Sequence, residues 1–258
     1  MSGFNLNDIE RVMVLGAHPD DEIIGPGGTA HMLASQGRKV SVVTFTDGGT
    51  AANSPAEMGA MIAKRRTEMS ATDNILGVTT RELIQIPSQQ VYRAVYGDLK
   101  VYDANAPGNG LTLHHKLIQL IRQHKPDLIF THSQDNHRDH CAIADITPQS
   151  VFQASESILA HLGTPWNVPL LLYYSVEGEL LGNFSPNTII EIRQEDLEAK
   201  MAAMRTQVSQ TRGDYLAHFL EMMHGRAQLW GAKLGAGRYA EPFYLSPRTP
   251  VRIELPRE

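Results

Sequence analysis

Two short segments of the sequence bring histidines and carboxylates close together. LGAHPDDE, residues 15–22, follows an apolar run and holds His18 three residues before Asp21, and HSQDNHRDH, residues 132–140, ends in two histidines with the same spacing. This spacing lets two side chains converge in a tight turn or a first helical turn. Two histidines and one carboxylate with an open position usually hold catalytic zinc, whereas magnesium or calcium takes more oxygens. The segments therefore predict a Zn²⁺ site with ligands from both.

The remaining polar residues of these segments suit metal-assisted hydrolysis. A metal with three protein ligands lowers the pKa of its bound water to roughly 7, and a nearby base must then accept a proton. Asp20 is the natural candidate for this base, and the second histidine of the HxxH pair is a candidate for stabilising an oxyanion or protonating the leaving group. Asp135 and Asp139 can orient the imidazoles through hydrogen bonds. Glu22 is either a supporting carboxylate of this kind or a first-turn residue of a helix.

The segments lie between alternating strands and helices. β-branched and apolar runs predict strands at residues 11–17, 39–45, 82–86, 127–131, 170–174 and 188–192. Helices are expected at 30–36, from a capping box at Ser54 and Glu57 to a stop at Gly77, and at 111–124, 195–210 and 215–234, with another after residue 140. This alternation predicts an α/β fold, a Rossmann-like, doubly wound, mostly parallel sheet with helices on both faces, forming one domain over residues 1–258.

Such a sheet places the two polar segments at one edge. Ligands of open α/β sheets bind outside the carboxyl ends of the strands, and both segments follow predicted strands. Asp47 follows the strand at 39–45, so it either belongs to a turn with Gly48 and Gly49 or is a candidate for the wall of a substrate pocket. The irregular residues 88–110 are long enough for an active-site loop. No GxGxxG pattern follows the first strand, which argues against a dinucleotide.

Composition narrows the class of partner and compartment. The net charge is -5, and the basic residues form no continuous stripe, which argues against a nucleic-acid partner. Cys141 is the only cysteine, so no intramolecular disulfide forms, and no apolar run reaches the roughly 18 residues of a membrane span. We expect a soluble cytoplasmic protein, and the sequence leaves open whether it is a homo-oligomer.

A family resemblance rests on the same two segments. AHPDDE near the N-terminus and DNHRDH after a later strand resemble the hallmark motifs of the PIG-L/LmbE-type N-acetylglucosaminyl deacetylases. Supporting matches extend along the chain: Arg65 and Glu68 before Leu76-Gly77, Lys125-Pro126-Asp127, Ser209-Gln210, and Tyr239-Ala240-Glu241 with Phe243.

The resemblance implies a role for individual residues. It implies zinc on His18, Asp21 and His140, with Asp20 as general base and His137 as the electrophilic or acid histidine. It also implies that Arg65 lies near the substrate, which would explain an arginine on the apolar face of a helix.

The sequence departs from the family pattern after residue 86. Many members carry an aspartate after a strand-ending Leu/Ile-Pro, whereas Ser88 follows Ile86-Pro87 here, and the loop at 88–110 is longer than usual. The sugar and acyl specificity therefore cannot be carried over. Inositol, malate, a second sugar, a nucleotide or an antibiotic core are all compatible aglycones.

These observations favour one function and leave two alternatives open. The favoured reading is a zinc-dependent hydrolase that removes the acetyl group of a small-molecule N-acetylglucosamine-type substrate, by attack of metal-bound hydroxide on the amide carbonyl. Two histidines and a carboxylate also hold iron(II) in oxygenases, although that chemistry needs no carboxylate base beside the ligands. The third reading is a non-catalytic sugar- or nucleotide-binding domain in which HPDDE only caps a helix.

Overall fold

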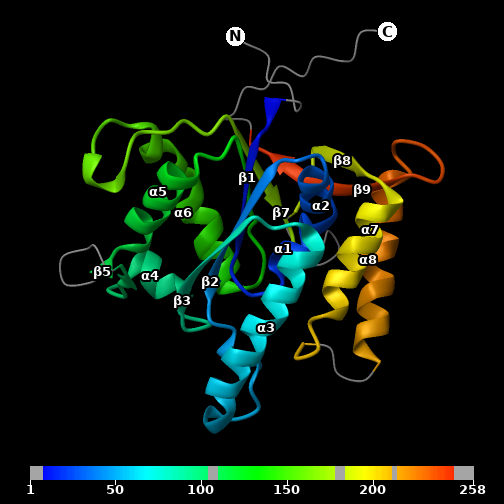
Figure 1. The fold of residues 1–258 in the computed structure, drawn as a ribbon, viewed down its shortest axis with the longest axis horizontal. Coiled ribbons are helices and arrows are strands. Elements are labelled where there is room, and N and C mark those ends of the chain that lie inside the picture. The colour runs from blue at the N-terminus through cyan, green and yellow to red at the C-terminus, as the bar shows by residue number, and fades with distance from the viewer. Residues whose placement is uncertain (1–7, 104–109, 178–183, 211–213, 247–258) are drawn as a thin grey trace.

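A seven-stranded sheet forms the centre of the molecule in a computed structural model that describes residues 8–103, 110–177, 184–210 and 214–246. The strand order is β3-β2-β1-β6-β7-β9-β8 (Figure 1). The first five strands in this order run parallel, and β9 is antiparallel to both β7 and β8. The strands are β1 (Arg11–Gly16), β2 (Lys39–Thr46), β3 (Thr80–Ile86), β6 (Leu128–His132), β7 (Leu170–Tyr174), β8 (Thr188–Ile192) and β9 (Tyr239–Leu245). The predicted mostly parallel α/β fold is confirmed.

Helices cover both faces of the sheet. On one face lie α4 (Val91–Tyr96), α5 (Leu113–His124) and α6 (Arg138–Ser155) (Figure 1). On the other lie α1 (Asp21–Ile24), α2 (Gly27–Ser35), α3 (Met58–Leu76), α7 (Gln194–Arg205) and α8 (Tyr215–Gly231). A two-stranded pair, β4 (Val101–Tyr102) with β5 (Gly110–Leu111), lies apart from the main sheet. No helix among the described residues is both long and apolar enough to cross a lipid bilayer.

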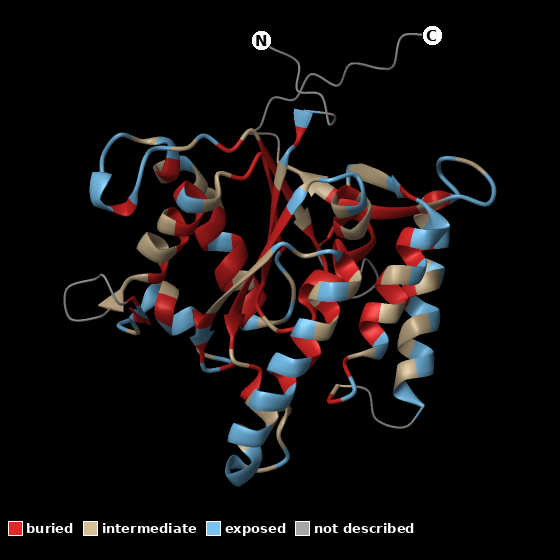
Figure 2. Ribbon diagram, in the orientation of Figure 1, coloured by how far each residue is buried: buried red, intermediate tan, exposed pale blue. Residues whose placement is uncertain are grey.

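Alternate residues of the central strands enter different cores. Met13 and Leu15 of β1 pack in the cluster that includes α5 and α6, whereas Val12 and Val14 pack in the cluster that includes α2. Figure 2 shows the buried residues concentrated along the strands and on the inner sides of the helices. Because both faces of the sheet are covered, the strand sequences are apolar almost throughout instead of alternating with polar residues.

The strand order places the two polar segments beside each other. β1 pairs with β2 on one side and with β6 on the other, both in parallel. The chain thus changes direction across the sheet between β1 and β6, which creates a crevice at their carboxyl ends. HPDDE follows β1 and the segment from Ser133 follows β6, so both lie at this crevice.

Several predicted boundaries were wrong. The helix predicted from a capping box at Ser54 begins as α3 at Met58, because residues Pro55–Glu57 form a 3₁₀ turn and the Ser54 side chain makes no cap hydrogen bond. Its predicted end is confirmed, since Gly77 is the left-handed C-cap with φ of 70°. The segment at 88–110 is not irregular throughout: its described part contains α4, β4 and the start of β5, while residues 104–109 lie outside the described ranges.

The C-terminal part of the structure differs more from the elements that the sequence predicts. The helix predicted over 195–210 ends as α7 at Arg205, and α8 ends at Gly231 and not at 234. β9 was not predicted, because Pro242 interrupts its pattern and proline is depleted in strand interiors. The register places Pro242 opposite Ile189 of β8. An antiparallel strand between β7 and β8 accounts for the sheet being mostly, and not wholly, parallel.

A buried ion pair joins β9, α7 and α2. The Lys200 ammonium lies 2.5 Å from Glu241 Oε1, with side-chain exposures of 6% and 3%. The same carboxylate accepts the backbone N–H groups of Gly28 at 3.0 Å and Thr29 at 2.8 Å, at the start of α2. Glu241 therefore satisfies otherwise unpaired donors at a helix N-terminus and complements the helix dipole.

We expect Glu241→Gln to lower the free energy of unfolding by about 3 kcal/mol, because it removes the negative charge that faces a buried ammonium. The matched control is Glu191→Gln, since Glu191 pairs with Arg238 at 2.9 Å with both side chains about half exposed. An exposed pair of this kind contributes less than about 1 kcal/mol. Urea unfolding of both variants checks the difference, and equal losses would contradict a structural role for Glu241.

Candidate metal centre

The HPDDE turn folds back on itself directly after β1. The carbonyl oxygen of His18 accepts the backbone N–H groups of Asp20 at 2.9 Å and Asp21 at 3.4 Å, and α1 begins at Asp21. The backbone N–H of His18 donates to Asp21 Oδ2 at 2.7 Å. This tight turn brings the side chains of His18 and Asp21 together at the sheet edge.

The second segment places His140 opposite this turn. After β6 the chain reaches His137, the N-cap of α6, and His140 lies in the first turn of that helix. Asp135 Oδ1 accepts the backbone N–H of His137 at 2.8 Å, and its Oδ2 lies 2.7 Å from His140 Nδ1. Because Asp135 occupies Nδ1, the Nε2 atom of His140 faces the first segment.

Three atoms from the two segments form a compact triangle. His140 Nε2 lies 3.2 Å from His18 Nδ1 and 3.6 Å from Asp21 Oδ2, and His18 Nδ1 lies 3.4 Å from the same oxygen. Ligands at 2.0–2.1 Å from a tetrahedral zinc ion are about 3.3 Å apart. The donor set, two imidazole nitrogens and one carboxylate oxygen at this spacing, fits a zinc ion.

A buried carboxylate contacts the outer nitrogen of each imidazole. Asp139 Oδ2 lies 3.3 Å from His18 Nε2, on the side away from the triangle, as Asp135 does for His140. Asp139 is fully buried. Contacts of this kind fix the ring orientation and the tautomer of a metal-binding histidine.

The pKa shifts show that the triangle favours positive charge. Burial lowers the pKa of the His18 imidazole, but hydrogen bonds with Asp139 and Asp21 outweigh burial and raise it to about 10. Burial raises the pKa of the Asp21 carboxyl, but the rings of His140 and His132 lower it well below its ordinary value. A divalent cation between these groups meets the same demand for positive charge.

His132, the first residue of the second polar segment, was not predicted as a ligand, yet it lies against the same centre. Its ring stacks on that of His140, with centroids 4.2 Å apart, and its Nε2 lies 3.1 Å from Asp21 Oδ2. Asp21, His132 and His140 thus form another group that could hold a metal, as do His18, His137 and His140. Its position at the last residue of β6, at the same sheet edge, was the available signal.

Two observations distinguish His132 from His18. His132 is fully buried, and its Nε2 already accepts the backbone N–H of Ala17 at 3.0 Å. Burial, with the His140 ring adding to it, lowers the pKa of the His132 imidazole to about 4. The His18 side chain, by contrast, is 18% exposed. A catalytic site needs an open position for water and substrate, which the group with His18 offers.

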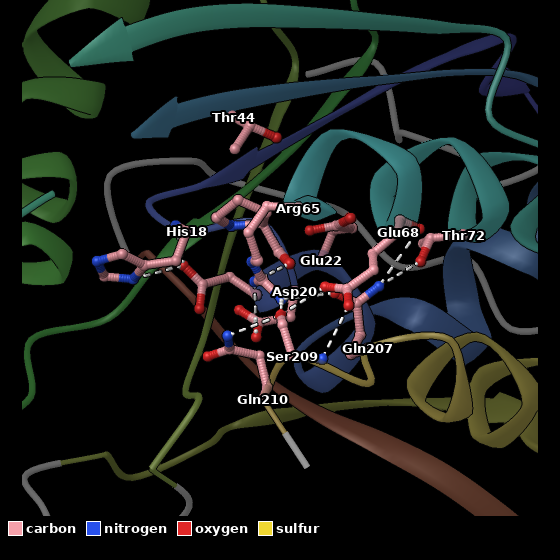
Figure 3. A network of polar contacts seen from close by, with 12 residues as sticks. His18, Asp20, Glu22, Thr44, Arg65, Glu68, Thr72, Gln207, Ser209 and Gln210 are labelled. Carbon is pink, nitrogen blue, oxygen red and sulfur yellow. Dashed lines mark hydrogen bonds and ion pairs between the residues drawn. The ribbon is translucent and has the colours of Figure 1, made fainter. Parts of the chain in front are cut away.

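Arg65 lies behind Asp20 and not at an open surface. Figure 3 shows its guanidinium between Asp20 and the chain after α7. Its Nη2 lies 3.0 Å from Asp20 Oδ2, and its Nη1 donates to Glu68 at 3.1 Å and to Gln207 at 2.8 Å. Asp20 Oδ1 has no hydrogen-bond partner among the described residues. The contact of Arg65 with substrate stays a prediction, and the geometry adds a contact with the predicted base.

The tautomer of His137 follows from its place at the start of α6. The backbone N–H of Asp139 donates to His137 Nδ1 at 3.2 Å, so a neutral ring carries its proton on Nε2. Burial and the neighbouring rings of His18 and His140 lower the pKa of this imidazole. Gln89 Nε2, an amide nitrogen, lies 3.2 Å from His137 Nε2, so this amide must turn its oxygen toward the ring for His137 Nε2 to act as a neutral N–H donor at the half-buried edge of the centre.

Two further predicted residues lie around the centre. Asp47 Oδ1 accepts the backbone N–H of Gly49 at 2.9 Å and lies 3.3 Å from the backbone nitrogen of Ser88, so it joins the ends of β2 and β3. Glu22 is buried in the first turn of α1 and pairs with Arg81 at 2.6 Å, and burial raises the pKa of its carboxyl. Substrate contact by Asp47 and support of the metal by Glu22 stay predictions.

The chain is similar to several known deacetylases. It is 25% identical to the 1D-myo-inositol 2-acetamido-2-deoxy-alpha-D-glucopyranoside deacetylase 2 of Saccharopolyspora erythraea, over 81% of this chain and 88% of that protein. The N,N'-diacetylchitobiose deacetylase of Pyrococcus horikoshii has the same fold, with a TM-score of 0.74 and 24% identity over 93% of this chain and 85% of that one.

The fold also occurs with another activity. The 4-carboxy-2-hydroxymuconate hydratase GalB of Pseudomonas putida superposes with a TM-score of 0.73 and 19% identity, over 95% of this chain and all of that one. The fold alone therefore does not define the reaction.

Sequence similarity decides the family. The family described as PIG-L, GlcNAc-PI de-N-acetylase, matches residues 13–151, more than half of the chain, and this region includes both polar segments. Together with the deacetylase relatives, this match makes the protein an N-deacetylase, an enzyme that hydrolyses an amide bond. The chain belongs to the PIG-L family.

Proposed function

We propose that the protein is a zinc-dependent hydrolase that removes the acetyl group from an N-acetylglucosamine-type sugar or glycoconjugate. The observation that carries this proposal is the triangle of His18 Nδ1, Asp21 Oδ2 and His140 Nε2, with sides of 3.2–3.6 Å. Asp20 and His137 flank this triangle in the two motifs. The substrate class is supported by the names of the relatives, which act on acetamido sugars.

His18, Asp21 and His140 would hold the metal, and Asp135 and Asp139 would orient the two imidazoles. Zn²⁺ bound there would activate water as a nucleophile and polarise the amide carbonyl. Iron(II) accepts the same ligands, but its oxygenase chemistry uses no carboxylate base next to them. The pairing of Asp20 with buried Arg65, which holds such a carboxylate in place, favours hydrolysis.

Asp20 would move the proton. Arg65 donates to Oδ2 and fixes the carboxylate, so Oδ1 is available to accept a proton from the attacking water. The same carboxyl would pass this proton to the departing nitrogen when the C–N bond breaks. Water and the N-acetyl compound then yield acetate and the free amine.

His137 would stabilise the negative charge that develops on the amide oxygen. Because Nδ1 accepts the N–H of Asp139, a neutral ring carries its proton on Nε2, and this N–H would donate to the amide oxygen. A donor that is oriented before the reaction stabilises an oxyanion without further reorganisation.

The metal assignment predicts which histidines are needed for binding. We expect the purified protein to hold one zinc ion per chain, and His18→Ala and His140→Ala to lose both the metal and acetate release, because each removes one of three ligands. His124→Ala is the matched control, since His124 Nε2 lies 2.9 Å from Glu82, away from the centre.

Metal analysis of the purified variants, combined with acetate release from N-acetylglucosamine derivatives, checks this prediction. If His18→Ala kept its full metal content and a His132 variant lost the metal, the metal would bind to the group of Asp21, His132 and His140 instead. Oxygen consumption with an iron-loaded protein and no acetate release would contradict the hydrolase.

The base assignment predicts a different pattern for Asp20. We expect Asp20→Asn to lower kcat by about 10²–10⁴-fold while the zinc content stays at one per chain, because the amide cannot accept the proton and is not a ligand. Asp98→Asn removes a carboxylate that pairs with Arg93 at 3.3 Å on an exposed surface, and this control should leave kcat unchanged. Unchanged turnover in Asp20→Asn would rule out this residue as the base.

A further inference from the structure

An arginine of the second polar segment makes a cation–π contact with a tyrosine of α4. Arg138 lies between His137 and Asp139 in the sequence, and its Cζ lies 5.2 Å from the centre of the Tyr92 ring. Tyr92 belongs to α4, which lies beside α6 (Figure 1). Gln89, just before α4, reaches His137 Nε2 with its amide at 3.2 Å. The start of α4 and the start of α6 together border the side of the centre where His137 lies.

The helix that carries Tyr92 is held in place independently of Arg138. The buried carboxylate of Asp139 accepts the backbone N–H groups of Gln89 at 2.8 Å and Val91 at 3.0 Å. The hydroxyl of Tyr96 donates to Asp145, further along α6. α4 is thus attached to α6 at both ends, and the contact of Arg138 with Tyr92 is not needed to dock it.

The charge of Arg138 is not neutralised within the described part of the chain. Arg138 is exposed, and no described carboxylate lies within ion-pair distance of it. The nearest acidic groups in sequence have other contacts, since Asp135 contacts His140 and Asp139 contacts His18. Arg65, by contrast, pairs with Asp20 and Glu68.

The geometry leaves the N–H groups of this guanidinium available. Its contact with the Tyr92 ring is a cation–π contact, and no described group accepts a hydrogen bond from its five N–H donors. A planar guanidinium in this position can bind a carboxylate or phosphate through two parallel hydrogen bonds. The metal centre itself is rich in carboxylates, so an anionic substrate needs a cation of this kind at the rim.

We propose that Arg138, supported by Tyr92, binds an oxyanion of the substrate, so that the enzyme acts on an N-acetylated amino sugar that carries a carboxylate or a phosphate. This inference rests on the proposed deacetylase function and adds the charge of the substrate to it. Arg138 is a specificity residue, because it contacts a part of the substrate that does not react.

Pairs of probes that differ in charge test this proposal. The first pair is the carboxymethyl glycoside of N-acetylglucosamine and its carboxamide, and the second is N-acetylglucosamine 1-phosphate and the methyl glycoside. We expect the wild-type kcat/KM for acetate release to favour the anionic member of at least one pair by about tenfold or more, the value of a charge-assisted hydrogen bond. A preference within the first pair identifies a carboxylate, and within the second a phosphate.

Arg138→Met should abolish this preference, and Arg138→Lys should restore only part of it, since lysine keeps the charge but lacks the planar fork. Arg93→Met is the matched control, because Arg93 is an exposed arginine of α4 whose charge is paired with Asp98. The control should keep the wild-type preference. The melting temperature of each variant shows that the changes do not reflect unfolding.

Equal kcat/KM values for the members of both pairs in the wild type would overturn the oxyanion site while leaving the deacetylase function intact. An equal loss for charged and neutral probes in Arg138→Met would also overturn it, since Arg138 would then support the centre and not recognise charge. If the zinc-loaded protein released no acetate from any of the probes, the proposed function would be overturned, and this inference with it.

Discussion

The buried carboxylate of Asp139 connects the metal centre to the elements around it. Oδ2 contacts the outer nitrogen of His18 and accepts the N–H of Gln89, and Oδ1 accepts the N–H of Val91. One side chain therefore orients a candidate ligand from the β1 turn and fixes the start of α4. Because Asp139 is in the first turn of α6, its charge also faces the positive end of the helix dipole. The orientation of His18, the position of the start of α4 and the charge at the start of α6 thus all depend on the Asp139 carboxylate.

The balance of charge around this group explains why the site favours a positive charge. Asp21, Asp135 and Asp139 approach the imidazoles from different sides, while Asp20 and Glu22 pair with Arg65 and Arg81 behind them. Burying carboxylates is unfavourable unless each is paired or hydrogen-bonded. The arginines satisfy the outer carboxylates, and the raised pKa of His18 shows that the inner ones still favour a positive charge. A divalent ion at the triangle would supply it.

The parts of this arrangement differ in how far the sequence could predict them. Both motifs follow apolar strands, so the sheet edge, the pairing of the segments and the approach of Asp135 and Asp139 to the imidazoles followed from local patterns. His132 lies at the end of a predicted strand, but local patterns do not show its contact with Asp21, which depends on how β6 aligns with β1. Arg65 was placed near the site, but its partners Gln207 and Ser209 become available only because α7 ends at Arg205, five residues earlier than its composition suggests. Helix ends of this kind are set by tertiary contacts that outweigh local propensity.

The same contacts explain how a region outside the family match completes the site. The match ends at residue 151, yet Arg65 is held by Gln207 and Ser209, and Glu241 fixes α7 and α2 through Lys200 and Thr29. The C-terminal elements therefore support Asp20 from behind, through Arg65, without contributing any of the three candidate ligands. A fold shared with a hydratase shows that the sheet alone does not determine the reaction. The proposed hydrolysis also needs the carboxylate of Asp20 beside the candidate ligands, and in this chain that carboxylate pairs with an arginine whose partners lie about 140 residues further along the chain.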